Sequence, residues 1–200
     1  MLRMFTSIAA AITLSAPALA EAGPGKLAPA FNTTDITGAN VSIPDLAGRM
    51  VVLEWTNHGC PFVKKHYNSG NMQSTQAFAD DMGAVWISIV SSAPGKQGNV
   101  TPGEAMELTT SRNANPSHVV LDPTGQIGRL YGARATPHMF VVAPDGKVAY
   151  AGAIDSIPSG NPADIEHAEN YVKSALTAIS AGVPVKTQAT QAYGCDVKYD

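Results

Sequence analysis

The residue best placed to do chemistry is Cys60. It follows an apolar run, Val51–Trp55, and a short polar turn, and Pro61 comes directly after it. Proline is favoured at the first position of a helix, because its missing N–H would be unpaired there and its φ is already helical. Cys60 is therefore expected at a helix N-terminus, where unpaired N–H groups lower the pKa of a thiol from its usual value of about 8.5. The pattern predicts a reactive thiolate, which requires that Cys60 be exposed.

Basic residues close to Cys60 in the sequence are expected to favour the thiolate further. They are His58, Lys64, Lys65 and His66. The alternative is a buried structural cysteine, but that role suits an apolar strand better than a Gly-Cys-Pro turn followed by charged residues. Cys60 is thus the first candidate for a nucleophile.

Residues 1–20 have the composition of a cleavable signal peptide. Arg3 gives a positive start, Met4 to Leu14 form an apolar stretch, and Ala18-Leu19-Ala20 is a small-residue cleavage site. This pattern predicts a periplasmic or secreted protein whose mature chain starts near Glu21. An uncleaved membrane anchor is the alternative. No later run is long or apolar enough to span a bilayer, so no stable membrane association is expected.

The second cysteine, Cys195, lies in a polar segment near the end of the chain. Two cysteines in an exported chain favour a pairing between them. Cys195 then either resolves an oxidised Cys60 or forms a permanent disulfide with it, and a free thiol is the third alternative. The tail is expected to be mobile, which suits a thiol that approaches and withdraws.

Composition limits the class of protein. The chain is 44% hydrophobic, which is normal for a globular protein with a core. A net charge of −3 and the lack of a basic run argue against nucleic acid as a partner. We expect one domain over residues 21–184, followed by a C-terminal tail, residues 185–200, that carries Cys195.

Apolar periodicity and turn signals predict strands and helices in alternation. Strands are expected at 31–36, 41–43, 50–55, 84–90, 118–121, 139–142 and 147–150, and helices at 61–67, 72–82, 101–112, 126–131 and 163–181. Thr101 and Glu104 form a capping box around Pro102. Asp145-Gly146 marks the turn of a hairpin. The order predicts an α/β sandwich whose mixed sheet is parallel in the middle and antiparallel at one edge.

Three segments together resemble the thioredoxin-like superfamily, and specifically its exported redoxin branch related to AhpC/TSA and TlpA proteins. They are the strand ending in Trp55 that leads to Cys60-Pro61, the segment Ala135-Thr136-Pro137 before a strand, and the hairpin over 140–148. The resemblance covers residues 27–181. It implies a thioredoxin-like three-layer sandwich, with a central mixed sheet flanked by helices and an N-terminal β-hairpin extension.

The same resemblance implies roles for residues around the thiol. Pro137 would follow a cis peptide bond and place the Thr136 backbone beside the nucleophile, where it can align an extended thiol or disulfide partner. Arg134 would stabilise a thiolate or bind peroxide oxygen, with a solvated loop charge as the alternative. Glu54 would accept a proton. His138 either faces the site or lies in the following strand.

The sequence also departs from the family patterns. Thioredoxins and TlpA-like reductases carry a second cysteine at the position of Val63, so dithiol exchange within Cys60–Val63 is impossible here. Typical peroxiredoxins carry a proline and a threonine at the positions of Leu53 and Asn57. The chain resembles an intermediate subgroup that has the scaffold and a single cysteine at the attacking position.

The leading hypothesis is an exported, thiol-dependent oxidoreductase with antioxidant, peroxiredoxin-like activity. Cys60 attacks a peroxide or a disulfide, and Cys195 resolves the sulfenic acid or mixed disulfide that results. No cofactor is expected, and a thiol reductant protein supplies the electrons. A second hypothesis is a reductase or isomerase for the disulfides of exported proteins.

A third hypothesis belongs to a different class, a copper-handling module. Thiol and imidazole side chains are suitable ligands for Cu(I), although their spacing here matches no standard metal motif. The candidate ligands are Cys60, His58, His66, His138 and Cys195.

Overall fold

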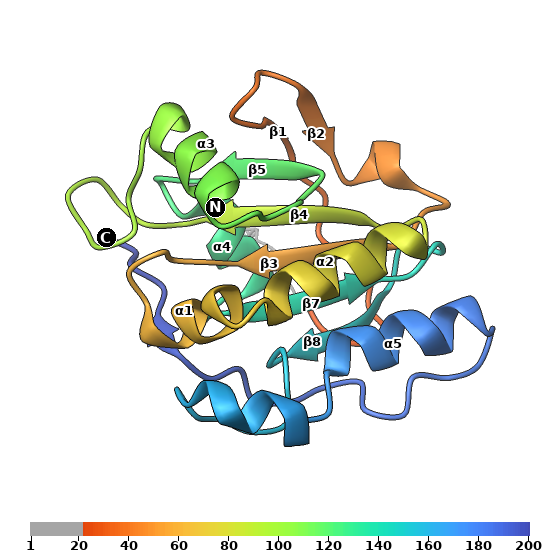
Figure 1. Cartoon of the computed structure of the whole chain (residues 1–200). Coiled ribbons are helices and arrows are strands. Elements are labelled where there is room, and N and C mark those ends of the chain that lie inside the picture. The colour runs from red at the N-terminus through yellow and green to blue at the C-terminus, as the bar shows by residue number, and fades with distance from the viewer. Residues whose placement is uncertain (1–21) are drawn as a thin grey trace, which may run out of the picture.

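A five-stranded mixed sheet runs through the middle of the protein (Figure 1). The computed structural model describes residues 22–200, so the expected signal peptide lies outside the described part of the chain. The strand order is β5-β4-β3-β7-β8. Three strands are parallel, β3 (Val51–Trp55), β4 (Val85–Val90) and β5 (His118–Leu121), and two are antiparallel, β7 (His138–Val142) and β8 (Val148–Gly152). The predicted mixed sheet with one antiparallel edge is confirmed.

Both faces of the sheet are covered, which gives three layers. One face packs against α1 (Pro61–Asn68), α2 (Asn71–Asp81) and α5 (Tyr171–Ser180). The other packs against α4 (Gln126–Tyr131) and the antiparallel hairpin of β1 (Asn32–Thr34) and β2 (Asn40–Ser42). The strands β3 and β4 are buried at every residue, as expected for strands covered on both sides. The sandwich and its hairpin extension are present as predicted.

The remaining elements complete the fold. They are α3 (Pro102–Ser111), the 3-10 helices η1 (Pro44–Leu46) and η2 (Pro162–His167), and the two-residue strands β6 (Ala135–Thr136) and β9 (Cys195–Asp196). Among residues 22–200, no helix combines the length and the apolar character that a bilayer span needs.

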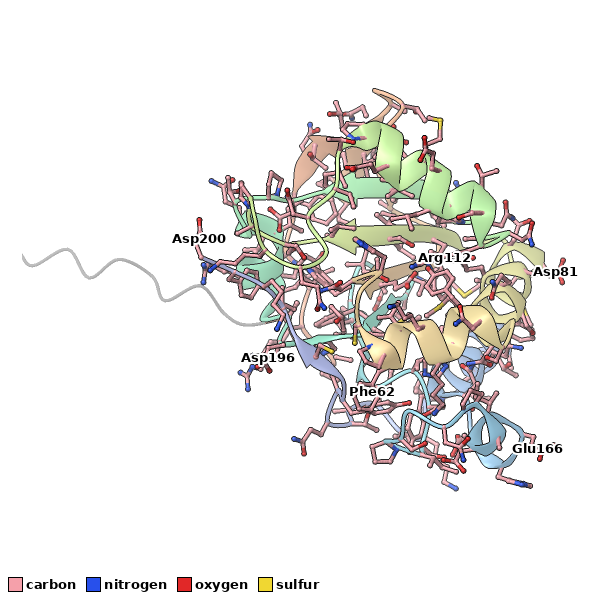
Figure 2. All side chains as sticks on the ribbon, turned by 60° about the vertical axis from the view of Figure 1, so that its left-hand side comes forward. Phe62, Asp81, Arg112, Glu166, Asp196 and Asp200 are labelled. Atoms are coloured by element: carbon pink, nitrogen blue, oxygen red, sulfur yellow. The ribbon has the colours of Figure 1, made fainter. Side chains whose placement is uncertain are left out.

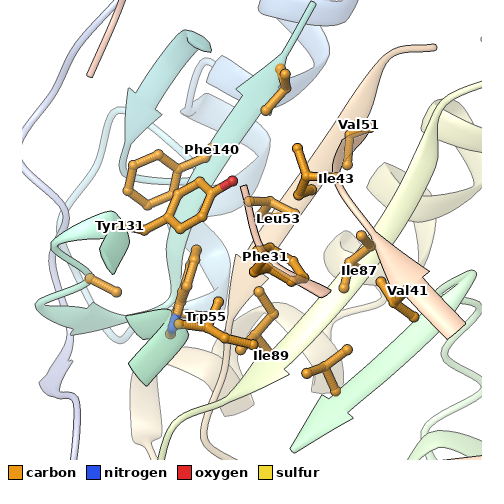
Figure 3. Close-up of a cluster of buried hydrophobic side chains, with 14 of the residues drawn as sticks. Phe31, Val41, Ile43, Val51, Leu53, Trp55, Ile87, Ile89, Tyr131 and Phe140 are labelled. Carbon is orange, nitrogen blue, oxygen red and sulfur yellow. The ribbon is translucent and has the colours of Figure 1, made fainter. Parts of the chain in front are cut away.

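Aromatic side chains fix the end of β3 (Figure 3). The ring centroids of Trp55, Tyr131 and Phe140 lie 5.3 to 5.4 Å from one another. Pairs at such distances add about 0.5–1.5 kcal/mol each beyond the burial of their surface. The Trp55 indole N–H also donates to Ser91 Oγ at 3.0 Å. The point from which the chain turns toward Cys60 is therefore held firmly.

The long helix predicted over residues 163–181 is wrong, because the chain forms two separate pieces there. The 3-10 helix η2 buries none of its residues, and α5 begins only at Tyr171. Asn170 caps α5, since its side chain accepts from the Lys173 N–H at 3.0 Å. An N-cap residue has extended backbone angles, so no helix can run through Asn170. The apolar periodicity of the sequence nevertheless continues across this position.

The tail is packed along the domain, so the expectation of a mobile tail is wrong. The strand β9 pairs antiparallel with β6. The Val197 N–H donates to the Arg134 carbonyl at 3.1 Å, and the Lys198 carbonyl accepts from Ala93 at 2.8 Å. Further along, the Tyr199 hydroxyl donates to a backbone carbonyl of the loop before β6 at 2.8 Å. The polar composition of the tail did not indicate these contacts, because they are made by backbone groups and by one tyrosine hydroxyl and not by apolar side chains.

The capping box at α3 predicts a loss of stability when it is removed. Thr101 Oγ1 accepts from the Glu104 N–H at 3.3 Å, and Glu104 Oε2 accepts from the Thr101 N–H at 2.7 Å. Thr101→Ala should lower the free energy of unfolding by about 1 kcal/mol in a denaturant titration. Thr110→Ala, at an exposed position in the last turn of the same helix, is the control and should change it by less than about 0.5 kcal/mol. Equal losses in the two variants would contradict the prediction.

Candidate active site

Cys60 occupies the N-cap of α1, as the sequence predicts. Its carbonyl accepts from the Lys64 N–H at 2.9 Å, which starts the helix. The turn before it is shaped by Asn57, whose side chain accepts from the Gly59 N–H at 2.9 Å. The Cys60 side chain is 0% exposed, so the exposure that a reactive thiolate requires is not met in this structure. It faces other parts of the chain, which lie far away in the sequence.

The cis-proline loop lies beside the thiol. The peptide bond between Thr136 and Pro137 is cis. The Cys60 thiol donates to the Thr136 carbonyl oxygen at 3.0 Å. Both expectations taken from the family resemblance, the cis bond and the approach of the Thr136 backbone, are confirmed.

Cys195 reaches the same place through β9. In the pairing of β6 with β9, Cys195 is the register partner of Thr136. Thr136 Oγ1 also donates to the Cys195 carbonyl at 3.3 Å. Both cysteines are free thiols, and they lie within hydrogen-bonding reach of each other. Figure 2 shows the tail strand passing the start of α1 near Phe62.

This close approach depends on Gly194. Its φ is +134°, and a Cβ atom there would lie 2.0 Å from the Thr136 carbonyl oxygen. Only a residue without a side chain fits at that distance. Gly194 was not predicted as a site residue, although a glycine directly before Cys195 could have indicated a close backbone approach there.

The Cys60 thiol has a lowered pKa in spite of its burial. Burial raises the pKa of Cys60, but hydrogen bonds from the Cys195 thiol, the Val63 backbone N–H and the Thr136 side chain outweigh it. Burial and the contact with Cys60 raise the pKa of Cys195 to about 11. Cys60 is therefore the more acidic thiol of the pair, and Cys195 is the thiol that donates to it.

Basic neighbours do not activate the thiol in the predicted way. Lys65 and His66 lie 3.3 and 3.9 Å from Asp155 instead. Burial lowers the pKa of His66 to about 4, so this ring is neutral at pH 7. Burial and two nearby cations also lower the pKa of His58. The acidity of Cys60 comes from hydrogen bonds and from the helix N-terminus.

Glu54 is a fully buried carboxyl on β3, on the same face of the sheet as α1. It accepts from the Tyr67 hydroxyl at 2.9 Å, from the Trp86 indole at 2.9 Å and from the Ser88 hydroxyl at 2.8 Å. Burial raises the pKa of Glu54, and these donors only partly offset it. The carboxyl ties α1 to the sheet, and its expected role as a proton acceptor stays a prediction.

Arg134 and His138 flank the cis-proline loop. The Arg134 side chain is exposed, and its backbone N–H donates to His138 Nδ1 at 3.3 Å. The His138 ring packs on Phe140 with 4.6 Å between the centroids. Of the two alternatives for His138, the one that places it in the strand holds. A peroxide-binding role for Arg134 stays a prediction.

The copper hypothesis finds no ligand set in the described chain. Over residues 22–200, no three side chains of the Cys, His, Asp and Glu types are grouped so that they could hold a metal ion. His66 instead contacts Tyr193 and Asn71, at 3.3 and 2.8 Å.

A pair of thiols built onto a thioredoxin-like sandwich is the working part of a thiol oxidoreductase, and this is the class of protein that the fold and the site define. The model of the AhpC/TSA family matches residues 24–151. The chain belongs to the AhpC/TSA family. Curated protein sequences gave no match.

Solved structures share the fold. A hypothetical protein from Sinorhizobium meliloti 1021 superposes with a TM-score of 0.72 at 18% identity, over 90% of this chain and 96% of its own. An uncharacterized conserved protein from Geobacillus kaustophilus gives 0.70 at 23% identity, over 88% and 92%. A thiol:disulfide interchange protein from Bacteroides sp. gives 0.51 at 19% identity, over 73% and 87%. At these identities the likeness concerns the fold alone.

The hydrogen bond between the two thiols predicts how the pKa of Cys60 responds to mutation. Cys195→Ala removes a donor to the thiolate, so the pKa of Cys60 should rise. The ultraviolet absorbance of the thiolate, followed against pH, measures this change. Cys195→Ser keeps a hydroxyl donor and should preserve part of the lowering. An unchanged or lower midpoint in Cys195→Ala would show that the contact does not activate Cys60.

Proposed function

We propose that the protein is a thiol-dependent peroxidase of peroxiredoxin-like type, which cycles between a dithiol and a disulfide of Cys60 and Cys195. The observation that carries the proposal is the hydrogen-bonding reach between the two thiols at the N-cap of α1, with Cys60 the more acidic. Thr136 and Pro137 shape the site, since the Thr136 backbone and side chain contact both cysteines.

The reaction proceeds in three steps in this proposal. The Cys60 thiolate attacks one oxygen of a peroxide, the O–O bond breaks, and Cys60 becomes a sulfenic acid. The alkoxide or hydroxide that leaves takes up a proton from the solvent and departs as an alcohol or water. Cys195 then attacks the oxidised sulfur, so that a disulfide forms and water leaves. A thiol reductant protein restores both thiols by exchange and leaves as its own disulfide.

Two features favour a small oxidant over a protein disulfide. The Cys60 side chain is fully buried, so a large substrate cannot reach the sulfur without displacing part of the chain. The edge of β6, where an extended partner would align beside the thiol, is already paired with β9. A peroxide does not need the edge, and it needs a much smaller opening to the sulfur than a protein disulfide does.

A second candidate function is thiol–disulfide exchange with exported proteins. The pairing of β6 with β9 favours it, because it demonstrates that this edge accepts an extended chain with a cysteine opposite Thr136. In that case a segment of the substrate takes the place of the tail, and Cys60 attacks its disulfide.

The two oxidants separate the candidates. Hydrogen peroxide should oxidise reduced protein faster than a protein disulfide does, and intact-mass measurement should give one internal disulfide between Cys60 and Cys195. Cys60→Ser should abolish turnover with either oxidant, because the attacking sulfur is lost. Cys195→Ser should still consume one equivalent of peroxide and then stop at the sulfenic acid.

Each result has a defined meaning. Wild-type peroxide turnover in Cys60→Ser would rule out the proposed chemistry altogether. Faster oxidation by the protein disulfide would favour the second candidate function instead.

We also propose that the protein is exported, because residues 1–20 carry the three parts of a signal peptide. The protein purified from its own cells should have the mass of a chain that begins at Glu21. A mass that includes residues 1–20 would contradict export by cleavage.

A further inference from the structure

The tail carries an anchor two residues before Cys195. Tyr193 inserts its hydroxyl into a group of side chains that we call the Asp155 cluster, made of Lys65, His66, Asp155 and Tyr193. The hydroxyl donates to Asp155 Oδ1 and lies 3.3 Å from His66 Nε2. Lys65 Nζ lies 3.3 Å from Asp155 Oδ2. Lys65, His66 and Asp155 are each at most 3% exposed, and the chemistry proposed above uses none of them.

The remaining hydrogen bonds of the cluster are internal to the domain. The Ile157 N–H donates to Asp155 at 3.2 Å, and Lys65 donates to the Ile157 carbonyl at 3.3 Å. A buried carboxylate is costly unless donors surround it, and each donor that it gains stabilises it. The Tyr193 hydroxyl is the donor that the tail contributes. The cluster therefore favours the docked tail over a detached one.

The side chains that contact the Tyr193 ring lie on α1, the helix that has Cys60 as its N-cap. The Phe62 ring packs edge-on against the Tyr193 ring at 5.8 Å, and Lys65 Nζ lies 5.7 Å from its centroid. Phe62, Lys65 and His66 occupy positions i, i+3 and i+4 of α1, so they form one face of this helix. The anchor point of the tail and the nucleophile are thus parts of a single rigid element.

The tail meets α1 at two points on either side of Gly194. Tyr193 contacts the first two turns of the helix, and Cys195 contacts the N-cap. Because Gly194 alone separates the two residues, fixing Tyr193 restricts the positions that the Cys195 sulfur can reach. In Figure 2 the tail strand runs past Phe62 toward Asp196.

We propose that Tyr193 is a positioning residue for the resolving step, which holds Cys195 against Cys60 while the Cys60 sulfur is oxidised. This inference rests on the proposed function. In the step, the Cys195 sulfur attacks the sulfur of the Cys60 sulfenic acid, an S–S bond forms and the S–O bond breaks. The hydroxide that leaves takes up the Cys195 proton and departs as water. Docking replaces a search by a free tail with a reaction between fixed neighbours.

A positioning role differs from a structural role in which step it affects. Replacing a residue that only stabilises the fold would change the free energy of unfolding. It would leave unaltered the ratio between the rate of Cys60 oxidation and the rate of disulfide closure. A residue that positions Cys195 leaves the attack of Cys60 on peroxide unchanged and slows the closure of the disulfide. The lifetime of the sulfenic acid therefore reports on position.

Tyr193→Phe is the variant that tests the proposal, because it keeps the ring against Phe62 and removes the hydroxyl. Peroxide should oxidise Cys60 at the wild-type rate. The disulfide should close about tenfold more slowly, so that dimedone traps a larger share of the sulfenic acid. Rapid quenching followed by intact-mass measurement follows the two products separately.

Tyr131→Phe is the matched control. It also removes one tyrosine hydroxyl, which donates to the Pro29 carbonyl at 2.7 Å on the other face of the sheet. This variant should close the disulfide at the wild-type rate. Wild-type closure in Tyr193→Phe as well would overturn the inference and leave the proposed function intact.

Failure of the proposed function gives a different result. If wild-type protein forms no sulfenic acid with peroxide, the peroxidase proposal is wrong. The role of Tyr193 is then tested with a small aromatic disulfide, which forms a mixed disulfide on Cys60 and loses a second thiol when Cys195 attacks. Release of that second thiol should be delayed about tenfold in Tyr193→Phe, and an undelayed release would again overturn the inference.

Discussion

The pairing of β6 with β9 is the constraint on which the site depends. Two residues of each strand bring Cys195 opposite Thr136, whose carbonyl accepts from the Cys60 thiol. A ladder this short has little stability of its own. It persists because the flanking tail is anchored, by Tyr193 on one side and by Val197 and Tyr199 on the other. The second thiol is therefore supplied by tertiary packing of the tail.

Two buried carboxyls hold α1 in place. Glu54 accepts from Tyr67 on the helix, and Asp155 accepts from Lys65, two residues earlier on the same helix. Each would be costly to bury alone, and each is surrounded by donors from several elements. The N-cap of this helix carries the nucleophile, so both carboxyls fix its position. Residues that do not react themselves can in this way hold the reacting groups close to the geometry that the reaction needs.

Local signals in the sequence predicted most of the scaffold, and in the site they predicted Cys60 at the start of a helix. Pro61 after Cys60 indicates a helix start, and the Thr101 capping box and the Asp145-Gly146 turn are each encoded within a few residues. The cis bond before Pro137 followed from the family resemblance and not from the dipeptide itself.

The parts that could not be predicted depend on contacts between distant segments. Cys60 is buried in a cluster that includes side chains from β7, β8 and α5, and Lys65 lies 3.3 Å from Asp155, which is 90 residues further along the chain. The helix break before Asn170 likewise follows from a cap that apolar periodicity does not reveal. A polar tail gives no periodic signal at all, and its two tyrosines are recognised as anchors only when their partners are known.

The order of the elements along the chain also determines when the two thiols can meet. A ribosome makes Cys60 and the whole sheet before it makes the segment that pairs with β6. Until residue 195 has been added, Cys60 lacks the thiol that is its partner. The thiol pair can therefore assemble only after β8 and α5 have been synthesised.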